Sequence, residues 1–229
     1  MTQQVIPEPP SNLPYRTPET QAWYDKYWKE FWLDMELTFS QKEDTQTPFL
    51  IDTLNRELDF NKISTVLEVG IGYGRVAKEI LEIPDNVIDL YDGVDISELA
   101  IKQSEIYLDD HVTKTKKGKR KNDHTGYDFM VGDFEELGIC ESYDLVISAE
   151  TMSILPSNYN VQKWIDLMVR MSKKYVVNLD YHEWSNSTVV FNNGRDYLKL
   201  YQDNDSIFRA DDFKIPDYPN EKIYICRVK

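Results

Sequence analysis

The stretch LEVGIGYGR, Leu67–Arg75, decides how this sequence is interpreted. It lies between ISTVLEVG, an apolar run typical of a strand, and GRVAKEILE, which has the apolar spacing of a helix. Glycines at 70, 72 and 74 let the backbone turn sharply and approach a ligand closely, and the following helix directs its positive N-terminal end into the same crevice. We therefore expect a nucleotide-like ligand at this turn.

Two common nucleotide-binding motifs fit this stretch poorly. The dinucleotide fingerprint needs its third glycine three positions after the second, and Arg75 occupies that position. A phosphate-binding P-loop needs Gly-Lys followed by Ser or Thr, and no such run follows the glycines. Both the NAD and the P-loop interpretation are weakened.

The rest of the chain alternates short apolar runs with helical patterns. After the glycine loop come YDGVDIS, YDFMV, YDLVISAE and KYVVNLDY as strands, separated by ELAIKQSEIYL, a basic loop and NVQKWIDLMVRMSK. This alternation indicates βαβ units and five parallel strands, with continuously apolar runs expected where both faces are covered. A helical RDYLKLYQDN follows, and a turn at Pro216, Asp217, Pro219 and Asn220 joins two extended runs into an antiparallel hairpin.

Four of these segments together resemble the class I S-adenosylmethionine-dependent methyltransferases. Their first motif, an acidic residue followed by Gly-x-Gly-x-Gly, corresponds to Glu68, Gly70, Gly72 and Gly74. In GVDIS, Asp95 would hydrogen-bond both ribose hydroxyls, the usual role of an acidic residue about 20 positions beyond the glycines, and Ile96 follows it. In VGDFEEL, the pair that contacts the adenine corresponds to Asp133 and Phe134, and YDLVISAE places Ala149 at the strand end beside the methyl group.

The resemblance spans about residues 63 to 181. It implies an α/β fold with a seven-stranded Rossmann-like methyltransferase sheet, mostly parallel, closed by the C-terminal hairpin and covered by helices on both faces. It also implies S-adenosylmethionine as the cofactor and S-adenosylhomocysteine as the product. Arg75 either pairs with the methionine carboxylate, as in some relatives, or is an ordinary helix-surface arginine. Asp144 begins a strand far from the ligand edge, and we expect a structural role for it.

We expect three parts in the chain: an extended or disordered tail at 1–17, an N-terminal helical cap at 18–60, and the S-adenosylmethionine-binding methyltransferase domain at 61–229. Thr17, Pro18 and Glu19 signal a helix start, and aromatic residues then recur at intervals of four. Such spacing is typical of core packing. The alternative is a lid over the cofactor pocket, which would use Tyr15, Trp23, Tyr24 and Trp28 to exclude water and surround a cationic group.

Length, composition and charge narrow the class of protein. A chain of 229 residues fits one domain with a cap, contains no apolar run long enough to cross a membrane, and shows no secretory signal, so we expect a cytoplasmic protein. The two cysteines are expected to be reduced thiols. A net charge of −14 argues against a general nucleic-acid surface. The basic run within 114–121 is either a solvated loop or a contact for phosphate, RNA or another acidic substrate.

The candidate catalytic residues follow the fourth and fifth expected strands. Methyl transfer needs alignment, desolvation and removal of a proton, and no metal is expected because His111, His124 and His182 do not form a ligand cluster by spacing. His182 follows the fifth strand and is our candidate general base, with Asp180 or Glu150 orienting the acceptor. The alternative is a solvated or capping histidine.

Three functions remain open from the sequence. The first is a methyltransferase acting on an O or N atom of a small molecule or metabolite. The second is a methyltransferase for a protein terminus, a protein side chain or RNA, and the third is a non-catalytic cofactor-binding relative that acts through a partner. The chain reads SAETMSILP after the fourth strand, without the Asp/Asn-Pro-Pro-Tyr of enzymes that methylate amino groups of nucleic acids and glutamine.

Overall fold

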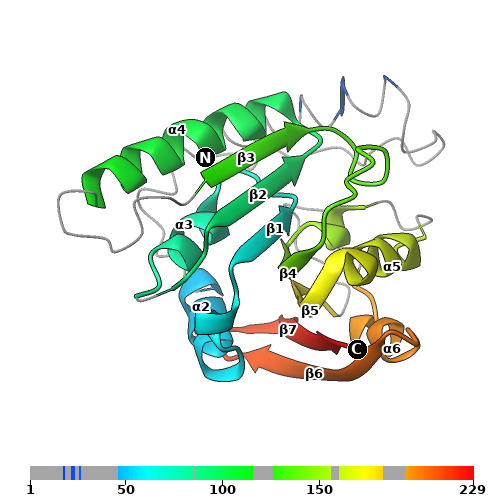
Figure 1. Ribbon diagram of the computed structural model, residues 1–229. Helices are drawn as coiled ribbons and strands as arrows, with labels where there is room; N and C mark the ends of the chain where they lie inside the picture. Colours follow the sequence, from blue (N-terminus) through cyan, green and yellow to red (C-terminus); the bar gives the residue numbers. More distant parts are fainter. Residues whose placement is uncertain are drawn as a thin grey trace.

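The computed structural model describes residues 46–84, 86–115, 126–155, 160–182 and 194–229, together with Pro18, Ala22, Trp23 and Lys26 (Figure 1). Its centre is one seven-stranded sheet in the order β3-β2-β1-β4-β5-β7-β6. The strands are β1 Thr65–Val69, β2 Leu90–Asp95, β3 Gly126–Val131, β4 Tyr143–Ala149, β5 Ser172–Tyr181, β6 Ile207–Ile215 and β7 Tyr218–Val228. Strands β1 to β5 pair in parallel, and β7 is antiparallel to both β5 and β6, which confirms the expected fold.

The helices cover both faces of the sheet. They are α2 Gln46–Glu57, α3 Arg75–Leu81, α4 Glu98–Thr115, α5 Gln162–Met171 and α6 Tyr197–Gln202, with short 3₁₀ helices η1 Phe60–Lys62 and η2 Met152–Ile154. Helices α2, α3 and α4 contribute to one hydrophobic cluster, while α5 and α6 contribute to a second one. The two clusters have no buried residue in common, so the sheet separates two layers of core.

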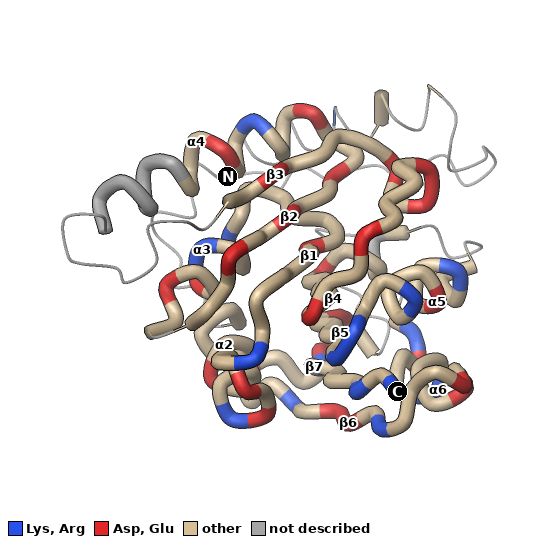
Figure 2. Tube along the Cα trace, viewed as in Figure 1, with Lys and Arg blue, Asp and Glu red and all other residues tan. Residues whose placement is uncertain are grey.

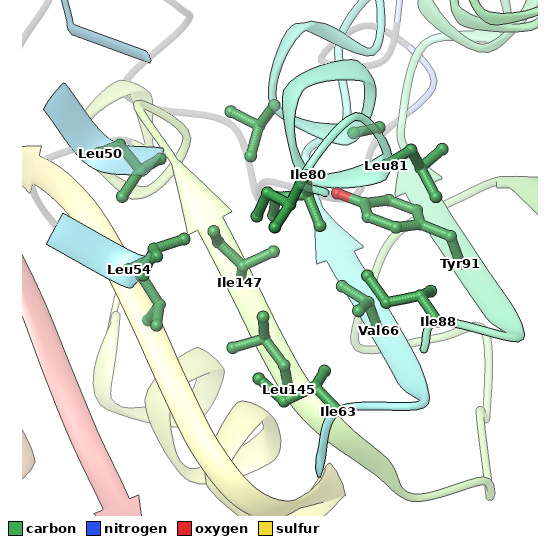
Figure 3. Close-up of a cluster of buried hydrophobic side chains, with 14 of the residues drawn as sticks. Leu50, Leu54, Ile63, Val66, Ile80, Leu81, Ile88, Tyr91, Leu145 and Ile147 are labelled. Carbon is green, nitrogen blue, oxygen red and sulfur yellow. The ribbon is translucent and has the colours of Figure 1, made fainter. Parts of the chain in front are cut away.

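Helix α2 packs directly on the sheet through the first cluster. Leu50 and Leu54 of α2 have no exposed surface and lie in the same cluster as Leu145 and Ile147 of β4 (Figure 3). Burying an aliphatic side chain of this size contributes roughly 1.5–3 kcal/mol, so α2 is held mainly by packing on the sheet. Part of the expected 18–60 cap therefore rests directly on the core.

The sheet order locates the site. The strand order reverses between β1 and β4: the chain adds β2 and β3 on one side of β1, and β4 and β5 on its other side. In open α/β sheets, ligands bind beyond the carboxyl ends of the strands at such a reversal. Val69 at the end of β1 is in register with Val94 of β2 and Ser148 of β4. The segments that follow these three strands therefore meet at one edge.

Two local expectations need correction. Helix α4 continues to Thr115 rather than ending near 108, so the basic run begins within a helix, while residues 116–121 lie outside the described ranges. The hairpin turn contains only Pro216 and Asp217, and Pro219 belongs to β7. Pro219 is tolerated there because the register between β6 and β7 shifts after Lys214, so the ladder does not require its missing N–H.

Charge and hydropathy agree with the sequence where they can be compared. Acidic residues recur along the sheet and its connections, consistent with the net charge of −14 (Figure 2). Among the described residues, no helix combines the length and apolar character needed to cross a membrane. Cys140 is exposed, Cys226 is buried, and both are free thiols as expected.

Candidate cofactor and acceptor site

The glycine loop after β1 is bound to the end of β2. The backbone N–H groups of Gly70 and Ile71 both donate to the carbonyl of Val94, at 2.8 and 3.0 Å. Gly70, Gly72 and Gly74 have φ angles of 78°, 55° and 86°, in the left-handed region that favours glycine. The loop therefore turns back at each glycine and reaches α3 with Gly74 as its N-cap.

Gly70 also marks a close approach between two parts of the site. A Cβ atom added to Gly70 would lie 2.2 Å from the hydroxyl oxygen of Thr151 and 2.4 Å from its methyl carbon. The Thr151 hydroxyl donates to the carbonyl of Ala149 at 3.1 Å, so this side chain fills the space between the glycine loop and the end of β4. Thr151 was not singled out from the sequence, although its position directly after the fourth motif is a usable signal.

Asp95 lies at the end of β2 and faces the loop, as its expected role requires. One carboxylate oxygen accepts from the N–H of Gly72 at 3.0 Å, and the other accepts from the N–H of Ser97 at 2.9 Å. A carboxylate has about four acceptor positions. The N–H groups of Gly72 and Ser97 use two of them, and the binding of a ribose diol by Asp95 stays a prediction.

Glu68 is a buried acidic residue of β1, two positions before the first glycine of the loop. Its side chain is buried, and its carboxyl accepts a hydrogen bond from the Tyr91 hydroxyl at 2.7 Å. Burial raises the pKa of Glu68 to about 8, while the hydrogen bond from Tyr91 and the charge of Arg75 act in the opposite direction. These contacts direct the Glu68 carboxyl toward β2 and α3, and its direct contact with a cofactor stays a prediction.

The third motif is joined to the second by the backbone. The N–H of Gly132 donates to the carbonyl of Asp95 at 2.8 Å, and Asp133 accepts from the N–H of Glu135 at 2.8 Å. Phe134 is buried and packs edge-to-face on Trp164 of α5, with ring centroids 5.4 Å apart. The ring of Phe134 therefore belongs to the second core cluster, and its contact with an adenine stays a prediction.

An ion pair connects the start of α3 with the end of β4. The Arg75 guanidinium binds the Glu150 carboxylate, and the two side chains are 16% and 28% exposed. Glu150 has a φ of 54°, in the left-handed region, and its N–H donates to the carbonyl of Leu179 at 2.7 Å. Arg75 thus already has a carboxylate partner from its own chain.

A second set of contacts continues from Arg75 to β7. Arg75 also donates to the side-chain oxygen of Gln46 at 3.5 Å, and the Gln46 amide donates to Glu221. Tyr181 is a further hydrogen-bond partner of Glu221. Burial, followed by the nearby charge of Glu150, raises the pKa of Glu221 to about 7. No sequence motif indicated Gln46 or Glu221, because only the antiparallel return of β7 places residue 221 opposite Tyr181.

Asp180 of β5 binds the backbone of the segment that follows β4. It is fully buried, and its carboxylate accepts from the N–H groups of Met152 at 3.0 Å and Ser153 at 3.2 Å. Arg195, which sequence reasoning missed, donates to the carbonyls of Met152 at 2.7 Å and Leu155 at 3.3 Å. Burial raises the pKa of Asp180 to about 7. These contacts favour a positioning role for Asp180, and direct orientation of an acceptor stays a prediction.

The remaining candidates are placed as follows. His182 follows β5, and its N–H donates to the carbonyl of Asn220 at 2.9 Å, while its role as a general base stays a prediction. Ala149 ends β4 and Ile96 follows β2, both partly buried at the same edge. Of the proposed lid residues, Trp23 is helical and partly buried, and the others lie outside the described residues: Tyr15, Tyr24 and Trp28.

Two further expectations concern metals and the far edge of the sheet. Within the residues that the structure describes, no group of three or more His, Cys, Asp or Glu could hold a metal ion. Asp144 lies at the start of β4, where it accepts from the N–H of Ser64 at 2.8 Å and pairs with Lys174 at 2.9 Å. It ties β1 to β4 and β5 at the edge opposite the glycine loop, as expected for a structural residue.

The sheet order, the glycine loop and Asp95 together define a doubly wound α/β protein whose ligand site lies beyond β1, β2 and β4. The profile of the methyltransferase domain family matches residues 67–175, which contain all four motifs. Residues 67–175, just under half of the chain, are therefore similar to a methyltransferase domain, and a domain of this kind implies S-adenosylmethionine as the cofactor. No curated protein sequence matches the chain.

Solved structures share the fold at low sequence identity. Magnesium protoporphyrin IX methyltransferase from Synechocystis PCC 6803, with bound S-adenosylhomocysteine, is 14% identical, has a TM-score of 0.65, and covers 90% of this chain and 98% of its own. A methyltransferase from Aquifex aeolicus is 12% identical, with a TM-score of 0.62 and coverage of 85% and 98%. The N-methyltransferase NodS from Bradyrhizobium japonicum, in complex with S-adenosylhomocysteine, is 14% identical, with a TM-score of 0.56 and coverage of 81% and 89%.

Proposed function

We propose that this protein is an S-adenosylmethionine-dependent methyltransferase that transfers the methyl group to an O or N atom of a small molecule. The contact between Asp95 and Gly72 carries the proposal, because it joins the glycine loop to the carboxylate that we expect to bind the ribose. The small-molecule acceptor is supported by the net charge of −14 and by a neighbour named as a magnesium protoporphyrin IX methyltransferase. The O or N atom is supported by neighbours named as O- and N-methyltransferases.

In this mechanism the cofactor supplies an activated methyl group, and the residues of the chain align the acceptor and exclude water. The glycine loop and Asp95 would hold the nucleoside, and Glu68 with Tyr91 would support the loop from behind. Asp180 and Arg195 would position the segment after β4 beside the reacting atoms. His182 is proposed to accept the proton of the acceptor.

The first test is cofactor binding by titration calorimetry. S-adenosylmethionine and S-adenosylhomocysteine should bind the full chain, and NAD should not. Binding of NAD without either sulfur nucleoside would refute the proposal.

The second test identifies the acceptor class. The protein is incubated with methyl-labelled cofactor and fractionated cell extract, and label in the small-molecule fraction is the expected outcome. Label in protein or RNA would favour a macromolecular acceptor instead. Cofactor binding with no transfer in any fraction would favour a non-catalytic relative that acts through a partner.

A further inference from the structure

The ion pair between Arg75 and Glu150 engages the guanidinium that, on the family resemblance, would receive the methionine carboxylate of the cofactor. Arg75 is the first residue of α3, directly after the N-cap Gly74 of the glycine loop. Its guanidinium is only partly exposed and is engaged by Glu150 from the end of β4. The pair therefore joins the start of α3 to the residue that follows β4.

Glu150 is held in this position by its surroundings rather than by its own backbone preference. A φ of 54° is unfavourable for a residue with a Cβ atom, because the left-handed conformation brings Cβ close to a carbonyl oxygen. The conformation is retained with two contacts, the backbone hydrogen bond to Leu179 and the ion pair with Arg75. Loss of the ion pair would leave Glu150 with only one of them.

A carboxylate arriving from outside competes with Glu150 for the same guanidinium. A guanidinium binds a carboxylate best through two parallel N–H donors, and two carboxylates on one pair of donors repel each other. Arg75 also uses a donor on Gln46, which is itself bound to Glu221. The donors of Arg75 are thus shared within the chain before any ligand is present.

We propose that Glu150 binds Arg75 in the ligand-free protein and that the carboxylate of the cofactor replaces it there on binding. Glu150 is then free to face the acceptor. This inference rests on the proposed function. In its ion-paired position Glu150 is already close enough to Tyr181 and Glu221 for its charge, after burial, to raise the pKa of both groups.

The test compares two ligands by titration calorimetry. S-adenosylhomocysteine carries the amino-acid end, and 5′-methylthioadenosine has the same nucleoside without it. If Glu150 competes for Arg75, Glu150→Gln should bind S-adenosylhomocysteine about 3- to 10-fold more tightly and leave methylthioadenosine unchanged. Unchanged or weaker binding of S-adenosylhomocysteine would overturn the proposal, as would an equal change for both ligands.

Two further variants keep the test informative. Glu150→Gly removes the carboxylate together with the unfavourable φ, so it should fold at least as well as the wild type and show the same gain in affinity. Arg75→Met should weaken S-adenosylhomocysteine selectively, and in that background Glu150→Gln should have no further effect. A wild-type protein that binds neither ligand would overturn the proposed function as well, whereas wild-type binding without the gain would overturn only this inference.

Discussion

Replacing Gly70 with alanine tests the packing between the glycine loop and the segment after β4. The new Cβ would lie 2.2 Å from the Thr151 hydroxyl oxygen, 2.4 Å from its methyl carbon and 2.7 Å from its Cβ, all far below contact distance. Displacing the half-buried Thr151 side chain to relieve such an overlap costs typically about 1–3 kcal/mol. The φ of 78° adds about 1–2 kcal/mol for a residue with a side chain.

We therefore expect Gly70→Ala to lower the free energy of unfolding by about 2–5 kcal/mol, measured by urea denaturation. Gly138 is a matched control, because its φ of 62° is also left-handed while a Cβ there would meet only the Glu136 carbonyl at 3.9 Å. Gly138→Ala should show the backbone contribution alone, about 1–2 kcal/mol.

A double-mutant cycle separates the steric contribution from the backbone contribution. Thr151→Gly removes every side-chain atom that the new Cβ meets, so combining it with Gly70→Ala should recover about 1–3 kcal/mol relative to additivity. The reasoning is refuted if Gly70→Ala is no more destabilising than Gly138→Ala. It is also refuted if the two substitutions at the site are simply additive.

Four further outcomes are expected. Asp95→Ala should weaken the binding of S-adenosylmethionine and S-adenosylhomocysteine by roughly 1.5–3 kcal/mol in calorimetry. Asp128 is an exposed acidic residue on β3, so Asp128→Ala should leave this binding unchanged, and equal effects of the two substitutions would argue against a ribose site. Because burial raises the pKa of Glu68 from 4.5 to about 8, the folded protein retains a proton that the unfolded chain releases. The free energy of unfolding should therefore fall as pH rises from 4.5 to about 8. Glu68→Gln should reduce this dependence by up to about 1.4 kcal/mol per pH unit in urea titrations, and an unchanged dependence would contradict the prediction. His182→Ala should lower the single-turnover rate by ~10²-fold or more without weakening cofactor binding, and a near wild-type rate would remove it from the mechanism. Neutralising the Lys and Arg residues within 114–121 should leave cofactor binding unchanged, whereas a salt-dependent loss of acceptor binding would point to RNA or another polyanion.

The sequence by itself determined the sheet and the cofactor side of the site. Continuous apolar runs in alternation with helical patterns predicted five parallel strands and the closing hairpin, because buried strands and covering helices have different hydrophobic periods. The glycine loop and the acid after β2 were predictable because their function depends on local backbone conformation and short spacing. Element ends were less accurate, as the extension of α4 to Thr115 shows, since tertiary contacts and capping decide where a helix stops.

Only the tertiary structure decided the acceptor side. Asp180 and His182 are close in sequence, yet Asp180 is directed to the backbone of η2 while His182 is bound through its backbone to Asn220. The partners of Arg75 include Glu150 and Gln46, which lie 75 and 29 positions away in the chain. Such contacts depend on which strands are neighbours and on which face of the sheet each side chain lies. The spacing of residues along one sequence does not specify either of these.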